Sequence, residues 1–367
     1  MTDETLFKIA ITKVPMVGPV IAKHLISYCG GVEAVFKAKR KELIKIPGVG
    51  NKTVDVLLKQ NPEKLAEQEL RFIDQHNIQP LFYLDEAYPN RLKNYPDCPL
   101  MLFYKGNVDL NHNRIVSIVG TRKPTPQGQS ICEDLITDLK DYGVIVLSGL
   151  AYGIDVTAHK KCLNLKIPTV GVLGHGLSQI YPSVHRNIAQ KMVQCGGLLT
   201  EFTSELGPER EHFPMRNRIV AGMCDALVVV ETKAKGGSMI TADIANNYNK
   251  DVFAVPGRIG DPLSKGCIGL IKSHKAALIE SAKDIAYIMR WEKAKAQKIV
   301  QKKLFLELSE SEAKVIGLIK EYDNLSIDQL NLEMKMTPSK MASLLLHLEF
   351  KGLVKSLPGK RYILEHS

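Results

Sequence analysis

Short apolar runs alternate with helix-length segments through most of the chain. Two of these runs, Ile115–Val119 and Val144–Leu147, each lead into a glycine-bearing turn, Gly120–Pro124 or Ser148–Asp155, that opens a helix. Both runs are rich in β-branched residues, as is typical of strands that are buried on both faces. Strand–turn–helix units in tandem predict an α/β fold with a doubly wound, mainly parallel sheet.

Six further apolar runs extend this sheet. They are Ile78–Leu84, Leu100–Tyr104, Thr169–Leu173, Leu198–Phe202, Ala226–Val230 and Asp251–Val255. Helix-length segments separate most of them, but we expect no helix between the first two, which would extend one edge of the sheet. The carboxyl edge of such a sheet presents helix N-termini and free backbone N–H groups, and these favour an anionic ligand.

A compact helical domain is predicted over residues 1–75. Within it, Lys45–Lys52 forms a Pro-Gly-x-Gly turn between two amphipathic helices, and Val14–Pro19 is a weaker copy with methionine in the place of a glycine. The turn resembles the helix-hairpin-helix motif of SAM-like domains, which can offer backbone N–H groups to a DNA phosphate. The candidate secondary contacts to a DNA backbone are Gly48, Gly50 and Lys52. The alternative is a tight turn that only packs helices.

The chain after the sheet predicts a linker and a third domain. Residues 291–303 are rich in Lys, Ala and Gln and favour a linker. In the C-terminal domain, residues 304–367, the pattern predicts three helices and a hairpin, over Ser311–Tyr322, Ser326–Glu333, Thr337–Phe350 and 353–364. Thr337 and Pro338 form a favourable N-cap and N1 pair for the third helix. Three helices and a hairpin describe a winged helix.

The formal net charge of +10 is concentrated in the middle of the chain. Residues 1–75 contribute +3, residues 76–303 contribute +8 and residues 304–367 contribute −1. The middle of the chain, residues 76–303, which holds the domain predicted over residues 76–290, therefore favours a polyanionic partner. In the winged helix, the slightly negative sum makes a protein contact as good an interpretation as a DNA contact.

Cysteine usage and hydropathy limit the cellular compartments in which the protein is expected. Seven scattered cysteines, without a C-x-x-C pair or a His/Cys cluster, indicate a reducing cytoplasm and no metal site. No apolar run of about 18 residues predicts a membrane span, and no secretory signal is evident at the N-terminus.

The candidate binding residues follow the predicted strands. They are Gly120, Thr121, Arg122, Gly149, Gly174, Arg210, Phe213, Arg216, Asn217, Arg218, Gly237 and Ser238. Binding of single-stranded nucleic acid without sequence preference requires groups that bind phosphate and a ring on which a base can stack. Helix N-termini and arginines supply the first, and one aromatic residue supplies the second. An alternative role for Arg216 and Arg218 is to brace loops by pairing with Glu201 or Glu231. Asp155 is expected to cap its helix.

The ordered motifs make a family resemblance specific. They are Ser148–Asp155, Phe213–Gly222, Glu231 with Gly237-Ser238, and Val255-Pro256-Gly257. Over roughly residues 78–290 the chain resembles the DNA-processing protein A family (DprA, also called Smf). That resemblance implies an extended Rossmann-type domain, without cofactor or catalytic activity, that binds single-stranded DNA. It also implies delivery of the strand to a RecA-type recombinase in natural transformation, displacement of single-strand-binding protein, and a homodimer.

The resemblance also implies roles for single residues. Arg122 would grip a backbone phosphate, and the segment Arg210–Phe213 matches the place of a family cation and a base-stacking aromatic. Ser183 and His185 depart from the lysine and asparagine that many relatives carry after Tyr-Pro. Arg186 is then the candidate for that phosphate contact.

The alternative function is a nucleotide-processing enzyme of the lysine-decarboxylase-like phosphoribohydrolase type. Those enzymes carry a Pro-Gly-Gly-x-Gly-Thr segment before a catalytic glutamate, and Pro256–Asp261 breaks that pattern. An NAD enzyme is disfavoured because Gly120–Arg122 does not begin G-x-G-x-x-G. His159 is expected to be an ordinary helix histidine, because no activated nucleophile is evident nearby. A binding protein is therefore the leading prediction.

Overall fold

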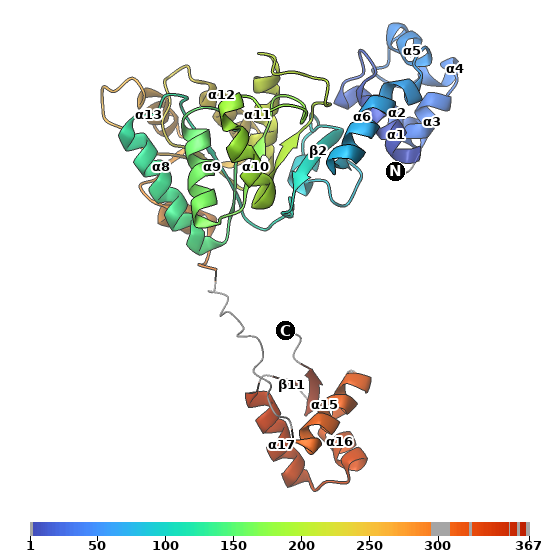
Figure 1. Ribbon diagram of the computed structural model, residues 1–367, viewed down its shortest axis with the longest axis vertical. Coiled ribbons are helices and arrows are strands. Elements are labelled where there is room, and N and C mark those ends of the chain that lie inside the picture. The colour runs from blue at the N-terminus through green and yellow to red at the C-terminus, as the bar shows by residue number, and fades with distance from the viewer. Residues whose placement is uncertain (1–2, 295–308, 323–324, 352, 358–359, 365–367) are drawn as a thin grey trace. The chain divides into compact units, whose positions relative to one another are not determined.

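The computed structural model describes residues 3–294, 309–322, 325–351, 353–357 and 360–364 (Figure 1). The chain forms two compact units, Met1–Ala294 and Lys295–Ser367. The segment 295–303 of the predicted linker lies outside the described residues. The first residues of the predicted linker, 291–294, are held on the larger unit, because the Trp291 N–H donates to Ala286 O and the Ala294 N–H to Asp141 O.

A nine-stranded sheet organises the larger unit, in the order β1-β2-β6-β5-β4-β3-β7-β8-β9. The strands are β1 (Gln79–Phe82), β2 (Met101–Gly106), β3 (Ile115–Val119), β4 (Ile145–Ser148), β5 (Thr169–Val172), β6 (Gly196–Thr200), β7 (Ala226–Val229), β8 (Asp251–Ala254) and β9 (Ala277–Leu278). All neighbours from β6 to β9 are parallel, whereas β2 is antiparallel to both β1 and β6. The mainly parallel sheet is therefore confirmed.

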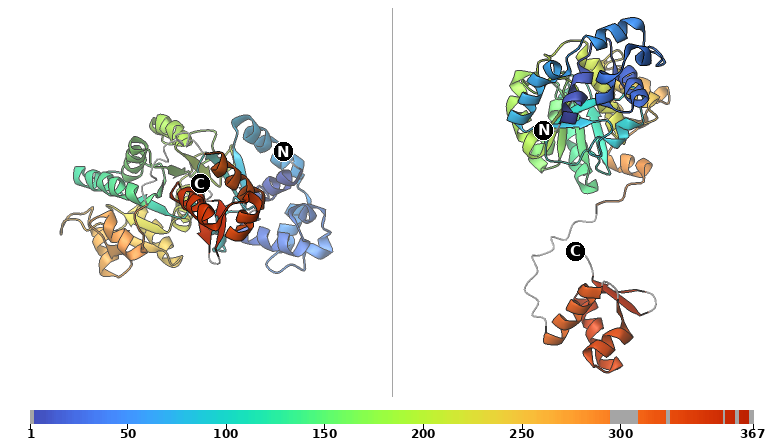
Figure 2. Two further views of the ribbon diagram at one scale, coloured as in Figure 1. Left: turned by 90° about the horizontal axis from the view of Figure 1, so that it is seen from below. Right: turned by 90° about the vertical axis from the view of Figure 1, so that its right-hand side faces the viewer.

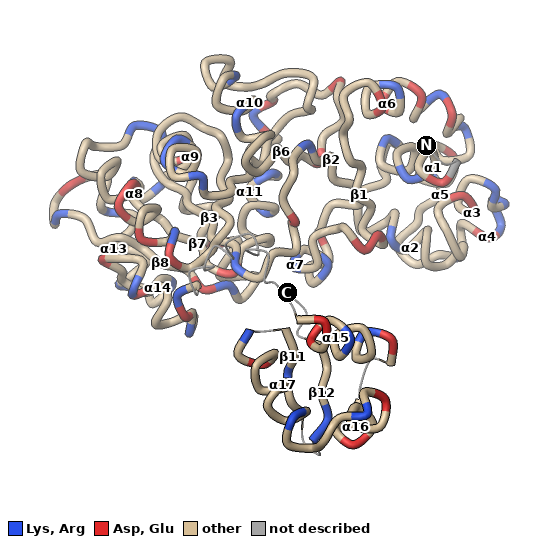
Figure 3. The backbone as a smooth tube through the Cα atoms, turned by 60° about the horizontal axis from the view of Figure 1, so that its bottom comes forward, with Lys and Arg blue, Asp and Glu red and all other residues tan. Residues whose placement is uncertain are grey.

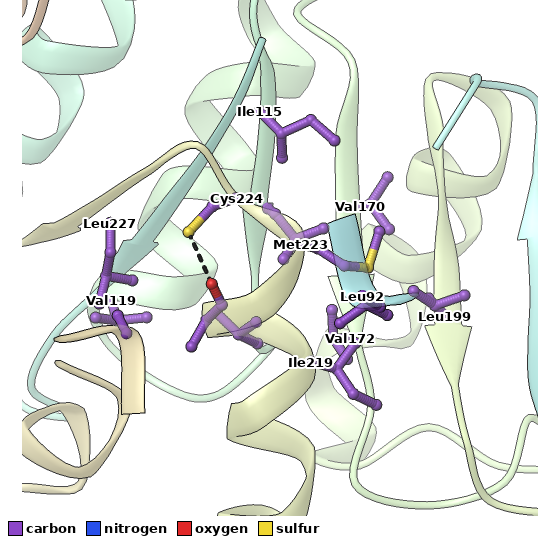
Figure 4. Packing of buried hydrophobic residues seen from close by; sticks show 14 of the residues in the cluster. Leu92, Ile115, Val119, Val170, Val172, Leu199, Ile219, Met223, Cys224 and Leu227 are labelled. Carbon is purple, nitrogen blue, oxygen red and sulfur yellow. Dashed lines mark hydrogen bonds between the residues drawn. The ribbon is translucent and has the colours of Figure 1, made fainter. Parts of the chain in front are cut away.

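Helices cover both faces of this sheet (Figures 1 and 2). They are α8 (Pro126–Leu139), α9 (Ile154–Leu165), α10 (Arg186–Gln194), α11 (His212–Met223), α12 (Gly237–Asn247), α13 (Lys265–Lys272) and α14 (Ala282–Met289). Along β3, Ile115 and Val119 join one core with α11, α12 and α13, and Val116 and Ile118 join the other with α8, α9 and α14. Figure 4 shows the first core, in which Ile219 of α11 lies close to Val172.

The N-terminal helices pack on the antiparallel edge of the sheet. They are α1 (Asp3–Thr12), α2 (Pro19–Cys29), α3 (Val32–Lys37), α4 (Arg40–Leu43), α5 (Asn51–Leu58) and α6 (Pro62–His76). Their core includes Phe82, Met101 and Phe103 from β1 and β2. Both predicted turns reach the left-handed region, with φ of 66° at Met16 and 80° at Gly48. The methionine thus adopts the backbone that glycine supplies in the second copy.

The smaller unit has the predicted winged-helix arrangement of three helices and a hairpin. Its elements are α15 (Glu310–Tyr322), β10 (Leu325–Ser326), α16 (Ile327–Met334), α17 (Pro338–Phe350), β11 (Val354–Leu357) and β12 (Arg361–Leu364). The three strands form an antiparallel sheet in the order β10-β12-β11. Thr337 is the N-cap of α17, as predicted, with Pro338 at its first position.

Three details differ from the prediction. The strands β9 and β10 were not predicted, because a two-residue strand leaves no periodic pattern. A single-turn helix, α7 (Asn90–Lys93), lies between β1 and β2, where we expected none.

Among the described residues, no helix has the length and apolar character needed to cross a bilayer.

Candidate nucleic-acid interface

A crevice of about 720 Å³ opens at the carboxyl ends of β3 and β7. The strand order reverses there, because β4 and β7 flank β3 on opposite sides. Ligands of open α/β sheets bind at such a switch point. Predicted site residues that line the crevice are Gly120, Thr121, Arg122, Gly149, Arg210, Phe213, Arg216, Asn217, Gly237 and Ser238. Gly174, Arg186 and Arg218 are not among its lining residues.

The first turn of the crevice is fixed by its neighbours. The Thr121 N–H donates to Glu231 O at 2.7 Å, and Thr121 O accepts from the Ile154 N–H at 3.2 Å. A Cβ at Gly120 would lie 2.5 Å from Ile154 Cγ1, so the close approach of α9 requires glycine there. Gly153 has a φ of 81°, which also favours glycine. The turn therefore holds Arg122 at a defined place.

Arg122 lies over an aromatic ring. Its Cζ is 5.8 Å from the centroid of Phe213, within the range of a cation–π contact. Arg122 is exposed, and no ion pair joins it to a carboxylate in the described part of the chain. Gly174 supports this arrangement from outside the crevice, since a Cβ there would lie 3.1 Å from Phe213 Cδ1. A cation and a half-buried ring thus share one opening.

The lining residues that were not predicted include a second aromatic ring and a further cation. Tyr181 is 49 % exposed, and its ring centroid is 6.0 Å from that of Phe213. Lys233 lines the crevice from the loop that follows β7. The position of each after a predicted strand end was the available signal. Figure 3 shows that basic and acidic residues are interspersed along the chain, so charge density alone does not mark the crevice.

Arg216 lies buried at the crevice floor, with 5 % of its surface exposed. Its Nη1 donates to Val172 O at 2.9 Å, and its Nε has no hydrogen-bond partner among the residues that the structure describes. Burial lowers the pKa of Arg216 and raises that of Asp155, and the attraction between the two groups opposes both shifts. A Cβ at Gly149 would overlap the guanidinium. Arg216 is therefore held by the Val172 carbonyl, with Asp155 as its opposing charge, and not by the glutamates considered from the sequence.

Asp155 does not occupy the capping position that we expected. The N-cap of α9 is Gly153, and Asp155 lies in the first turn of the helix. Its Oδ2 accepts from the Ala151 N–H at 3.4 Å. The N-cap is therefore two residues earlier in the chain than predicted, at Gly153 instead of Asp155.

Arg218 lies away from the crevice and has the bracing role that was its alternative. It forms an ion pair with Glu201, and its Nη1 donates to Asp97 O at 2.5 Å. Both side chains of the pair are largely buried. Burial raises the pKa of Glu201, and Arg218 opposes that rise. The charge of the Arg218 guanidinium is thus already compensated by a carboxylate of the protein.

Arg186 is an exposed residue at the first position of α10. Of the two neighbours that depart from the family pattern, Ser183 is exposed, and His185 is buried with its Nδ1 2.9 Å from Leu150 O. His185 therefore serves the packing of this turn. The position of Arg186 is compatible with a contact outside the crevice.

His159 has the structural role expected from the sequence. It is fully buried in α9, and its Nδ1 is 2.7 Å from Thr169 Oγ1. Burial lowers the pKa of His159 to about 3, so the ring is neutral at physiological pH. In the part of the chain that the structure describes, no cluster of three His, Cys, Asp or Glu side chains could hold a metal ion.

The fold and crevice define a class of protein: an extended Rossmann-type sheet between a helix-hairpin-helix domain and a winged helix. The model of the DNA recombination-mediator protein A family matches residues 79–290. A DprA winged-helix model matches residues 306–360, and a SAM-like helix-hairpin-helix tandem matches residues 8–60. The chain belongs to the DNA-processing protein A (DprA/Smf) family.

Individual relatives agree with this assignment. The chain is 31 % identical to Protein Smf of Synechocystis over 98 % of both sequences. It is 39 % identical to DNA processing protein DprA of Streptococcus pneumoniae over 62 % of this chain and 82 % of that one. The crystal structure of the pneumococcal protein matches with a TM-score of 0.63 and 30 % identity, over 80 % of this chain and 99 % of that chain.

A second solved relative is DNA processing protein A from Helicobacter pylori, studied for its single-stranded DNA binding mode. It matches with a TM-score of 0.54 and 27 % identity, over 59 % of this chain and 97 % of that chain.

Proposed function

We propose that this chain binds single-stranded DNA without sequence preference, protects it, and loads a RecA-type recombinase onto it during transformation or recombination. The observation that carries the proposal is the pairing of Arg122 with Phe213 in one crevice. A backbone cation beside a ring is the pair of contacts that single strands need, because every nucleotide has a phosphate and a stacking face. The Helicobacter pylori relative supports the same ligand.

The phosphate side of the crevice is built from backbone and side chains together. The N-terminus of α12 begins at Gly237 with no side-chain cap, and Gly236, Gly237 and Ser238 line the crevice. Uncapped N–H groups at a helix start favour an anion. The exposed cations that line the same crevice are Arg122, Arg210 and Lys233. Arg210 and Lys233 are exposed, as phosphate contacts require.

The acidic groups near the crevice do not favour the phosphoribohydrolase alternative. Asp155 is the carboxylate among the lining residues, and Arg216 lies beside it. The Glu231 carboxylate accepts from the Thr125 N–H at 2.9 Å and from Thr125 Oγ1 at 2.7 Å. A general base needs a carboxylate that can reach the substrate. A binding role therefore agrees better with these contacts than a hydrolytic one.

Further contacts belong to the same proposal. Gly48, Gly50 and Lys52 surround the start of α5, whose N-cap Gly50 has no side-chain cap, and they would provide a secondary contact to a DNA backbone.

The recombinase, single-strand-binding protein and a second copy of this chain are the proposed protein partners. The charge of −1 in residues 304–367 favours a protein partner for the winged helix.

The test of the proposal compares oligo-dT with blunt duplex at two salt concentrations. Oligo-dT is expected to bind much better than duplex, and its affinity should fall roughly tenfold or more between about 50 and 200 mM salt as counterions are released. Equal affinity for the two ligands would count against the proposal. Incubation with AMP is the second arm, and release of the base without oligo-dT binding would favour the enzyme instead.

Phe213 provides a separate test of stacking. Phe213→Ala is expected to weaken oligo-dT binding by about 1–3 kcal/mol, because a base loses its stacking partner. The salt dependence should stay nearly unchanged, since no cation is lost. Tyr28→Ala, at a 63 % exposed ring on α2, is the matched control and should bind like the parent. A lowered melting temperature with intact binding would assign Phe213 to packing alone.

A further inference from the structure

The loop from Glu201 to Glu211 joins β6 to α11 and carries part of the crevice. Arg210 lies near its end, and Phe213 follows in the first turn of α11. Arg210 is exposed and has no ion pair in the described part of the chain. The position of both residues therefore depends on what holds this loop.

The N-terminal helices hold the loop through a buried carboxylate. Glu69 of α6 is 2 % exposed, and its Oε2 accepts from the Ser204 N–H at 2.7 Å and from Ser204 Oγ at 2.6 Å. A second contact follows one residue later, where Lys13 Nζ lies 2.8 Å from Glu205 Oε1. Burial raises the pKa of Glu69, and the two Ser204 donors oppose that rise.

The loop that follows β5 holds the same stretch from another side. Ser178 Oγ donates to Ser204 O at 2.5 Å, and the Gly176 N–H donates to Leu206 O at 2.9 Å. Beyond this stretch, the ring of His212 stacks on Phe202 with centroids 4.2 Å apart. Ser204 is thus fixed on both sides, and the connection to α11 is short.

We infer that Glu69 is a positioning residue for the DNA crevice: from the helical domain, it fixes the loop that presents Arg210 and Phe213. The inference rests on the proposed function for its ligand. A buried carboxylate is costly and contributes little net stability, so a set loop conformation is the better account of its presence. Fixing a loop before binding removes an ordering cost from the binding step. Glu69 therefore links the helical domain to the DNA crevice without itself touching the strand.

The test uses the full chain with three substitutions. Glu69→Ala removes the acceptor and is expected to weaken oligo-dT binding by about five- to twentyfold, because the Ser204 N–H loses its partner and the loop is released. Glu69→Gln keeps a carbonyl acceptor and should recover most of the affinity. Glu63→Ala removes an exposed carboxylate from the first turn of the same helix and should match the parent. The salt dependence should not change in any variant, because no phosphate contact is lost.

Limited trypsin digestion of the same proteins provides a readout that does not depend on DNA. Cleavage after Arg210 is expected to be about tenfold faster in Glu69→Ala than in the parent, and unchanged in Glu63→Ala. Unchanged cleavage in Glu69→Ala would overturn the inference even if oligo-dT binding fell. If the parent does not bind oligo-dT, the proposed function fails, and the cleavage rates still decide whether Glu69 holds the loop.

A milder variant covers the case in which Glu69→Ala does not fold. Ser204→Ala removes only the hydroxyl donor, and it should weaken binding by about two- to threefold and accelerate cleavage by a similar factor. Parent-like values for both measurements would contradict the positioning role.

Discussion

Arg122→Ala is expected to weaken oligo-dT binding by about ten- to a hundredfold, the range for loss of one charge-assisted phosphate contact of roughly 1.5–3 kcal/mol. The fixed turn between β3 and α8 is the physical reason for so large an effect. Thr121 is hydrogen-bonded to Glu231 and Ile154, so Arg122 needs little ordering when a phosphate arrives. Fluorescence anisotropy with labelled oligo-dT at low salt measures the change directly.

Two further substitutions separate geometry from charge. Arg122→Lys should recover only part of the affinity, because lysine keeps the charge but loses the forked donor geometry. Lys123→Ala removes an exposed charge from the next position, which does not line the crevice, and should change binding by less than about threefold. Parent-like binding by folded Arg122→Ala would show that the strand lies elsewhere.

Gly149→Ala is expected to destabilise the protein by about 2–4 kcal/mol, because one methyl group would occupy the space of the Arg216 guanidinium. Arg216 would have to leave Val172 O, and its charge would lose the environment that Asp155 provides. The change would also alter the crevice floor, so oligo-dT binding should fall even where the protein remains folded.

Urea unfolding at fixed pH measures this loss of stability. Gly269→Ala is the matched control, because Gly269 is exposed in α13 and a Cβ there meets nothing within 4 Å. Alanine in that helix should leave the free energy of unfolding unchanged or raise it by up to about 1 kcal/mol. If Gly149→Ala unfolds at the same urea concentration as the parent, Arg216 can move freely and is not a fixed part of the floor.

Short apolar runs carried most of the fold prediction. The run Ile115–Val119 coincides with β3. Every residue of that strand is buried, so its whole length is apolar or small and its bounds are visible in the sequence. Helix starts were less accurate, as Asp155 shows. The backbone of Gly153 lets the chain enter α9 without a polar side chain at the N-cap. Such an entry has no residue-type signature that distinguishes it from a capped start.

The site prediction was limited by pairing that depends on tertiary structure. Arg216 and Arg218 are two residues apart on one helix, yet only Arg216 lines the crevice. Arg218 pairs with Glu201, which follows the last residue of β6. The sequence offered this pairing only as an alternative. Tyr181 was overlooked as a second ring because its distance from Phe213 depends on two loops.

The shared core of the helical domain and the strand pair β1–β2 affects how the protein can be divided. Phe82, Met101 and Phe103 bury their side chains among the N-terminal helices. A fragment that begins at residue 76 would leave these rings and the methionine facing water beside an edge strand, a combination that promotes aggregation. Dissection of this family member is therefore better done with point substitutions than by deletion of its first helices.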